Sequence, residues 1–439
     1  MMRSMYSAVS SLRAHQLRMD VIGNNIANVN TVGYKGSRVT FQEVFSQTLS
    51  GAGRPQEGGR GGTNPQQVGL GVGISSMDTF HIRGAVETTG YNTDLMINGE
   101  GFFIVSDTAG GANKSYTRAG NLGLDTDGNL VTPDGYYVLG YESDGEGGFV
   151  ESLTGLKISR SITNPPKATD KAIFEGNIDS KLKGPQAEDS TATPPIPAVP
   201  GEKFSSVMKV YDSLGNPHNI EVTFERTDDG KGATREFDVN ITKINNVEQT
   251  ENLIDFKLQF NSEGKLVSTN KSVDIKVEDA PAGSGLFQGA NPLDINLDFS
   301  KLTSYAENSD AAALNINGYG SGKLDDFTIA ANGEIEGVFS NGQTQILGKI
   351  RLANFKNPAG LIKTGSNMYR ETANSGEAMF GDAGMGGFGS LRAGALEMSN
   401  VDLSNEFTNM ITTQRGFQAN SRIISTSDEM LQEIVNIKR

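Results

Sequence analysis

The sequence predicts a mixed, mainly β protein, with nested β domains in the middle and N- and C-terminal α-helices that pair into a coiled-coil-like inner domain. Three observations lead to this expectation. Apolar residues recur every seven positions near each end of the chain. The middle alternates short apolar runs with turn-forming dipeptides such as Asp-Gly. Glycine makes up 54 of 439 residues, well above its usual share of about 7%, as expected of a turn-rich chain.

The composition excludes several classes of site. Lysine and arginine total 38 against 52 acidic residues, so the net charge is 38 − 52 = −14. A chain this acidic is a poor candidate for binding nucleic acid or anionic lipid. The absence of cysteine excludes disulfides, thiolate zinc sites, iron–sulfur clusters and cysteine nucleophiles. No apolar run approaches the ~18 residues of a membrane-spanning helix, so we expect no membrane insertion.

The first residues, Met1 to Ser7, lack the apolar segment and the small-residue cleavage site of a secretory signal peptide. Taken alone, this predicts a cytoplasmic protein. The acidic, cysteine-free composition suits an extracellular bacterial protein equally well. An export route that cleaves nothing would reconcile the two.

Each end of the chain is expected to form one helix, the first within residues 1–30 and the second within 395–439. The second should start at a capping box of Ser399 and Asp402 and reach Ile437, about 54 Å at 1.5 Å per residue. A strict seven-residue period is typical of helices that supercoil around neighbours. We therefore expect two apolar rows to face other subunits. The rows are Met5, Leu12, Met19 and Ile26, and Leu403, Met410, Phe417, Ile424 and Leu431.

A plainer interpretation is that each is an amphipathic helix packed on an ordinary core. The flanking sequence argues against it, because glycine-rich stretches separate the helices from the middle. We expect residues 31–75 and 381–394 to be connectors, either flexible or irregular. A helix at the end of such a joint has no partner in the middle domains. Since isolated helices are marginal in water, the termini should become ordered only on assembly.

The middle of the chain is expected to hold one β domain inserted into another. Residues 76–165 and 300–380 would form a β core domain, and residues 166–299 an outer β domain. Prolines concentrated in residues 184–201 predict an exposed loop there. Asn-Gly and Asp-Gly dipeptides between apolar runs predict hairpin turns. These are at Asn98-Gly99, Asp127-Gly128, Asp134-Gly135, Asn332-Gly333 and Asn341-Gly342.

No motif of catalytic or binding chemistry stands out. The chain has three histidines, far apart in sequence, and lacks H-E-x-x-H, G-x-S-x-G and P-loop patterns. The segment from Asp125 to Asn129 has its glycine misplaced for a calcium loop and is expected to be a hairpin turn. Scattered carboxylates do not distinguish a glycosidase pair from surface charge. We therefore predict no catalytic, cofactor-binding or metal site and no cofactor.

The segment just after the first helix carries a specific pattern. It resembles the N-N-x-A-N-x-N-T-x-G-Y-K signature of bacterial flagellar rod and hook proteins. Residues 400–420 resemble the other end of that family, and residues 94–105 and 116–141 resemble its shared core domain. The signature positions are Asn24, Asn25, Ala27, Asn28, Asn30, Thr31, Gly33, Tyr34 and Lys35.

Within that family the chain looks like a hook protein, because residues 210–218 and 353–361 resemble its outer and returning core segments, and rod proteins are much shorter. The resemblance implies a structural subunit that self-assembles as a helical homopolymer. The tube would be curved and flexible, a universal joint that transmits torque from rod to filament and encloses the export channel. Implied partners are the distal rod protein, the hook cap, hook–filament junction proteins and the flagellar type III export apparatus. That apparatus would deliver the subunit uncleaved to the extracellular hook of the flagellum.

Two alternatives remain open at this point. Within the family, the chain could be a distal rod protein, a hook-capping protein or another axial protein. From another class, it could be a secreted β-domain adhesin or carbohydrate-active enzyme. That class would need a cleft with paired carboxylates or an aromatic platform, and it leaves the apolar rows at both ends unexplained.

Overall fold

The computed structural model describes residues 2–55, 61–145, 147–186, 199–228, 234–248, 254, 256–277 and 289–437. The fold is mainly β with a long helix at each end, which confirms the predicted fold class. The chain divides into two compact units. Unit 1 comprises Met1–Ser159, Asp326–Gly337 and Gln345–Arg439, and unit 2 comprises Arg160–Asp325 and Val338–Thr344. Among the described residues, no helix combines the length and apolar character needed to cross a membrane.

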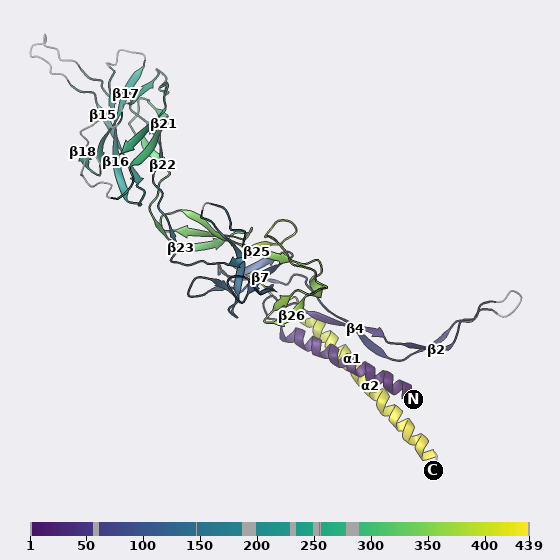
Figure 1. Cartoon of the computed structure of the whole chain (residues 1–439). Coiled ribbons are helices and arrows are strands. Elements are labelled where there is room, and N and C mark those ends of the chain that lie inside the picture. The colour runs from purple at the N-terminus through teal and green to yellow at the C-terminus, as the bar shows by residue number, and fades with distance from the viewer. Residues whose placement is uncertain are drawn as a thin grey trace, which may run out of the picture. The chain divides into compact units, whose positions relative to one another are not determined.

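The two helices of unit 1, α1 (Met2–Ala27) and α2 (Leu403–Ile437), lie side by side (Figure 1). Their direction follows from two hydrogen bonds. Asn420 Nδ2 donates to Ser11 Oγ at 2.8 Å, and Asn25 Nδ2 donates to Glu406 Oε1 at 3.3 Å. Because residue numbers fall along α2 as they rise along α1, the helices are antiparallel. The 35 residues of α2 give it a length of about 52 Å.

The start of α2 differs in detail from the expected capping box. Asp402 Oδ1 accepts the backbone N–H groups of Ser404 at 2.9 Å and Asn405 at 3.3 Å, so Asp402 is the cap. Ser399 Oγ instead accepts the N–H of Val401, ahead of the helix. A carboxylate is favoured at this position because it satisfies free N–H groups and complements the helix dipole.

The first predicted connector is largely ordered. Residues that follow the signature form two antiparallel ribbons, in which β1 pairs with β4 and β2 pairs with β3. Phe41 of β1 packs edge-on against His15 of α1, with ring centroids 5.5 Å apart, so α1 supports this ribbon. The expectation of a flexible or irregular segment is therefore wrong for most of it. The strands are β1 (Ser37–Glu43), β2 (Ser46–Ser50), β3 (Gln66–Gly69) and β4 (Val72–Thr79).

The second glycine-rich stretch, residues 381–394, is also ordered. Its glycines allow close packing: a Cβ on Gly381 would collide with the ring of Phe388, and one on Gly389 would lie 2.9 Å from Gly99 Cα. Gly381 and Gly389 therefore reflect tight contacts, whereas Gly384, Gly386, Gly387 and Gly394 adopt positive φ. The strands in and around this stretch are β28 (Met379–Asp382), β29 (Ser390–Ala393) and β30 (Ala395–Glu397).

The β core of unit 1 is one antiparallel sheet with the strand order β25-β11-β7-β8-β27-β26. Aromatic side chains fill it: the Phe102 ring lies 5.8 Å from Phe355 and 5.7 Å from Tyr369. A short 3-10 helix, η1 (Pro358–Gly360), follows β25. The strands of this part of the chain, of which β5 and β6 pair outside this sheet, are β5 (Val86–Thr88), β6 (Leu95–Asn98), β7 (Phe102–Ser106), β8 (Lys114–Thr117), β9 (Gly123–Leu124), β10 (Leu130–Val131), β11 (Tyr137–Glu142), β12 (Thr154–Gly155), β24 (Glu334–Phe339), β25 (Thr344–Asn354), β26 (Ile362–Gly365) and β27 (Met368–Arg370).

Four of the five predicted hairpin turns join paired strands, and one does not. Asp127-Gly128, Asp134-Gly135, Asn332-Gly333 and Asn341-Gly342 each link neighbours in a sheet, with the glycine at positive φ. The hairpin expected at Asn98-Gly99 is wrong. There β6 pairs with β29, whereas β7 pairs with β8, β11 and β25. The Asn98-Gly99 turn therefore connects β6 in one sheet to β7 in another, because β6 pairs with a strand that lies far away in the sequence.

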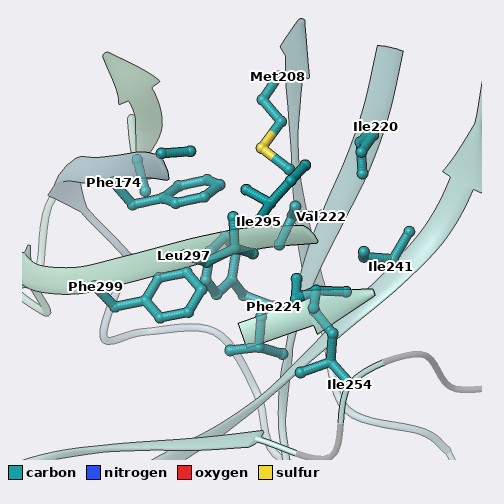
Figure 2. Close-up of a cluster of buried hydrophobic side chains, with 14 of the residues drawn as sticks. Phe174, Met208, Ile220, Val222, Phe224, Ile241, Ile254, Ile295, Leu297 and Phe299 are labelled. Atoms are coloured by element: carbon teal, nitrogen blue, oxygen red, sulfur yellow. The ribbon is translucent and has the colours of Figure 1, made fainter. Parts of the chain in front are cut away.

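Unit 2 contains two sheets whose inner faces share one apolar core. One sheet runs β15-β16-β17-β18 with β19 beside β17, and the other runs β20-β21-β14-β22. Side chains alternate between buried and outward-facing along β15, the pattern of a strand with one face on a core. Figure 2 shows Phe174, Leu297 and Phe299 from one sheet against Val222 and Phe224 from the other.

The strands of unit 2 are β13 (Thr163–Asn164), β14 (Lys171–Asn177), β15 (Lys203–Tyr211), β16 (Pro217–Arg226), β17 (Arg235–Ile244), β18 (Val247–Glu248), β19 (Phe256–Phe260), β20 (Ser272–Val277), β21 (Leu293–Thr303) and β22 (Ala312–Ile316), and β23 (Gly322–Ile329) has residues in both units. The loop predicted at 184–201 lies mostly outside the described residues. The nested division into four parts stays a prediction.

Candidate functional site

The seven-residue row of α2 lies along the side on which α2 meets α1. Thr413 is buried and Asn420 bonds to α1, and Phe417 lies between them at helical spacing, on the same face. The predicted contact of these rows with neighbouring subunits stays a prediction. Half-buried row members are Met5, Leu12, Met19 and Ile26 in α1 and Met410, Phe417, Ile424 and Leu431 in α2, and Leu403 is exposed.

A second set of apolar side chains on the helix pair is exposed. Phe407 and Ile411 of α2 are 50% and 53% exposed. The sequence shows Phe407 and Val435 on a row next to the seven-residue row, but Gln414, Ser421 and Asp428 interrupt it, and Ile411 belongs to neither row. Large apolar side chains concentrated on one element are typical of protein contact surfaces. The other exposed members are Met2, Tyr6 and Val9 in α1 and Leu403, Ile423, Met430, Ile434, Val435 and Ile437 in α2.

The ribbon of β2 and β3 exposes a further apolar face. Gln47 pairs with Val68, and the N–H of Leu70 donates to the carbonyl of Phe45 at 2.8 Å. Because alternate residues of a strand share a face, Phe45, Val68 and Leu70 lie on the same face, and all three are exposed. Leu49, at the register shift between Thr48 and Ser50, is exposed as well. The described chain therefore presents apolar surface on both the helices and the ribbon.

The signature segment ties the end of α1 to its surroundings. Asn25 is 2% exposed, and its Oδ1 accepts the Tyr34 hydroxyl at 3.2 Å and the N–H of Ser37 at 3.0 Å. Its Nδ2 donates to the Ser37 carbonyl at 2.7 Å and to Glu406 of α2. Burial raises the pKa of both Tyr34 and Glu406. One amide thus joins α1, β1 and α2.

The remaining signature residues divide between the turn and the surface. Gly33 has φ +67°, and a Cβ there would lie 2.7 Å from the backbone nitrogen of Ala119, so only glycine fits. Its N–H donates to the Glu397 carbonyl at 2.7 Å. Thr31 Oγ1 donates to Asn28 Oδ1 at 3.1 Å. Asn24, Ala27 and Asn30 are exposed.

Lys35, the last signature residue, belongs to a buried charge cluster. Lys35 is 0% exposed, and its Nζ lies 2.7 Å from Glu397 Oε1 and donates to the Ile82 carbonyl at 2.8 Å. Arg118 Nη1 lies 3.5 Å from Glu397 Oε2, and its Nη2 donates to the Gly99 carbonyl at 2.8 Å. Burial lowers the pKa of Lys35 and of Arg118, and Glu397 opposes that effect.

The sequence analysis missed Glu397, the ionic partner of Lys35, and Arg118, the second cation that pairs with Glu397. A signal was present in the run Ala395-Leu396-Glu397-Met398, because a lone acid in an apolar run needs a buried cation or polar partner.

His81 lies beside this cluster and carries no charge at neutral pH. Its ring packs edge-on against Phe102 at 5.7 Å and Tyr369 at 5.6 Å. Burial, followed by repulsion from Lys35 and Arg118, lowers the pKa of His81 to about 4. The cluster therefore holds two cations and one carboxylate, and its neutral histidine adds no further charge.

The described residues offer protein-contact surfaces and no arrangement typical of catalysis. They contain no group of three or more histidine and acidic side chains placed to hold a metal ion. Asp125 Oδ1 accepts the N–H groups of Asp127 and Asn129, so this segment is a turn, as predicted. His218 is held by Asp212 and Asn245, at 3.2 and 2.9 Å.

Four family models match the chain. They are "Flagella basal body rod protein" at residues 5–35, "Flagellar hook protein FlgE/F/G D1 domain" at 96–178, "Flagellar basal body protein FlaE D2 domain" at 177–319 and "Flagellar basal body rod FlgEFG protein C-terminal" at 392–437.

Curated relatives match over the full length. The chain is 40% identical to the flagellar hook protein FlgE of Borreliella burgdorferi and 37% identical to that of Treponema pallidum, each over 100% of both chains. It is 32% identical to the flagellar basal-body rod protein FlgG of Bacillus subtilis, also over 100% of both. The solved Helicobacter pylori flagellar hook protein FlgE2 is 18% identical, with a TM-score of 0.49 covering 70% of this chain and 99% of that one.

Proposed function

This chain belongs to the bacterial flagellar hook protein family and is a structural subunit of the hook, not an enzyme; from that premise we propose that its copies assemble through their terminal helices into a curved, flexible tube. The observation that carries the proposal is the exposed apolar surface of the helix pair, which includes Phe407 and Ile411. Contact with another copy would bury these side chains.

The two units would have different roles in the tube. The half-buried row that contains Phe417 would complete its burial between helix pairs of neighbouring copies, which stabilises the inner wall of the tube. Each apolar side chain buried in this way contributes about 1.5–3 kcal/mol, as an upper estimate. Unit 2 would meet its neighbours through polar surfaces, which exchange contacts more easily than an apolar seam. The tube would then resist twisting, transmit torque from rod to filament and still bend.

Family membership supports the remaining expectations. We propose that the subunit passes through the flagellar export apparatus and is added to an extracellular tube that encloses the export channel. That tube would meet the distal rod protein at its base, and the hook cap and hook–filament junction proteins at its tip.

The first test substitutes Ile411→Asp, because a charge at a buried contact is costly while Ile411 is free in the single chain. We expect loss of tubes in electron microscopy and of swimming, with an unchanged thermal unfolding curve of the purified subunit. The matched control is Val207→Asp in β15, where the side chain is 65% exposed. Tubes from Ile411→Asp as abundant as those from the control would refute assembly through α2.

Phe417→Asp tests the seven-residue row. Because Phe417 is half-buried in the single chain, we expect loss of tubes together with weaker α1–α2 pairing, seen as reduced helicity in circular dichroism. Normal tubes from Phe417→Asp would show that this row does not face neighbouring copies.

A deletion tests the division of labour. Lys167 and Tyr319 exchange two backbone hydrogen bonds at 2.9 and 3.0 Å, so the segment between them leaves and returns at adjacent points. Replacing residues 168–318 by a short glycine linker should therefore leave the inner part intact. We expect tubes that assemble but are straight or irregular in electron microscopy. If a stable, exported subunit formed no tubes, the inserted domain would be needed for assembly itself.

A further inference from the structure

The side of α2 opposite α1 carries charges in a polarised order. Arg415, Arg422, Glu429 and Glu433 follow one another at spacings of 7, 7 and 4 residues, which places them on one helical face. All four are exposed. We call these four residues the charged row; its N-terminal half is basic and its C-terminal half is acidic.

The charged row has no ion-pair partner among the described residues. None of its four side chains lies in an ion pair with another described residue. Glu429 and Glu433 are also four residues apart, where like charges on a helix repel. A second helix that brings arginines to these carboxylates would relieve that repulsion.

The spacing of the charges selects an offset between parallel copies of α2. With no offset, arginine faces arginine and glutamate faces glutamate. An offset of seven residues brings Arg422 onto Glu429 of the next copy, but it also places Arg415 against Arg422. Offsets of 433 − 422 = 11 and 429 − 415 = 14 residues are the shortest that bring an arginine onto a glutamate without a like-charge contact. At 1.5 Å per residue this is about 17–21 Å along the helix axis.

We propose that the charged row sets the axial offset between neighbouring subunits, with α2 of one copy packed parallel to α2 of another and displaced by 11–14 residues. The occupant is a second copy of this chain, because both halves of the complementary pair lie on one helix. Charges at the margin of an apolar helix contact commonly set partner orientation and register in this way. The inference rests on the proposed assembly through the terminal helices.

The first test exchanges charges in the full-length protein. Arg415→Glu with Arg422→Glu makes the charged row uniformly acidic, and we expect the concentration needed for tube formation to rise roughly tenfold or more. Adding Glu429→Arg and Glu433→Arg restores opposite halves and should restore tubes. Lys181→Glu with Lys183→Glu, exposed in unit 2, changes the net charge equally and should have no effect. Failure of the fourfold exchange to restore tubes would overturn the inference.

The second test measures the offset itself. Since the chain has no cysteine, introduced thiols crosslink only with each other. Gln418→Cys with Gln432→Cys, 14 residues apart on the exposed side, should yield a ladder of disulfide-linked oligomers when assembled tubes are oxidised. Each single variant should yield none.

The crosslinking outcomes separate the alternatives. Dimers from Gln418→Cys alone would mean that copies pack in register. A double variant that stops at the dimer would mean an antiparallel two-fold pair, which also matches the charges but closes on itself. Either result overturns the proposed offset. Failure of the unmodified protein to form any tube would instead refute the proposed function on which the inference rests.

Discussion

The β-sandwich of unit 2 and the helix pair of unit 1 use similar apolar side chains in opposite ways. Phe224 in the sandwich is 0% exposed, whereas Ile411 on α2 is 53% exposed. Two facing sheets cover each other, so the sandwich is complete in one chain. Two paired helices cover one side of each, and the other side stays open. The first region covers its apolar side chains within one chain, and the second leaves apolar side chains that the proposed assembly would cover.

Truncation in the sandwich should give the largest loss of stability. The Phe224 ring lies 5.9 Å from Phe174 and 6.1 Å from Phe299, so Phe224→Ala removes a centre of the core. We expect a loss of about 3–5 kcal/mol in denaturant unfolding of the purified subunit. Val207→Ala, on the outer side of the same sandwich, should change stability by less than about 0.5 kcal/mol. Equal effects would contradict the view that the sandwich is complete in one chain.

Removing the charge of the buried cluster should cost a comparable amount. Glu397→Gln keeps hydrogen-bonding atoms but leaves Lys35 and Arg118 without a counter-charge, and we expect a loss of about 3–5 kcal/mol. The comparison residue is Glu87, which is exposed on β5 beside β30, and Glu87→Gln should be close to neutral. If Glu397→Gln were as harmless as Glu87→Gln, the cluster would not hold the signature segment in place.

Acid should weaken the same region through His81. Its pKa is about 4 in the folded chain against 6.5 for the free side chain, so the unfolded chain binds the proton first as pH falls. The contribution of neutral His81 is therefore complete above pH 6.5 and is lost as pH falls from there towards 4. His81→Phe should unfold with a smaller pH dependence over this window. Identical pH profiles would show that His81 is not the titrating group.

The smallest effect on the single chain is expected on the open side of the helix pair. Ile411→Ala should change the free energy of unfolding of the purified subunit by less than about 0.5 kcal/mol, because its side chain has few contacts there. Sedimentation should nevertheless show that a higher protein concentration is needed for assembly. A large loss of monomer stability would show that Ile411 contacts other residues of its own chain. The open side of the helix pair would then not differ from the sandwich as described.

Local sequence patterns predicted the terminal helices and most of the turns, because neighbouring residues determine where a helix or a turn forms. The seven-residue spacing from Leu403 to Leu431 identified α2, and Asp127-Gly128 and Asp134-Gly135 identified turns because their glycines adopt positive φ. The Asn98-Gly99 signal predicted a turn but not which strands it would join. That choice depends on β29, which is nearly 300 residues away in the sequence.

The sequence predicted neither the charge cluster nor the ordered structure of the connectors, because both depend on contacts with residues elsewhere in the chain. Arg118 and Glu397 meet across 279 residues, and no local pattern marks such a contact. Glycine-rich sequence is equally consistent with a flexible joint and with close packing. The neighbours decide between them, and the ring of Phe388 against Gly381 does so here.

The bond between Lys35 and Glu397 has a consequence for how this protein can change over evolution. It fastens the two ends of a segment of about 360 residues, so everything between them is a closed loop as seen from the terminal helices. The entropy cost of closing a loop grows only with the logarithm of its length, about 0.6 kcal/mol per doubling. Whole domains can therefore be gained, lost or exchanged within that loop at little thermodynamic cost to the helices. Lineages are then free to vary the outer parts while keeping the two fastened ends.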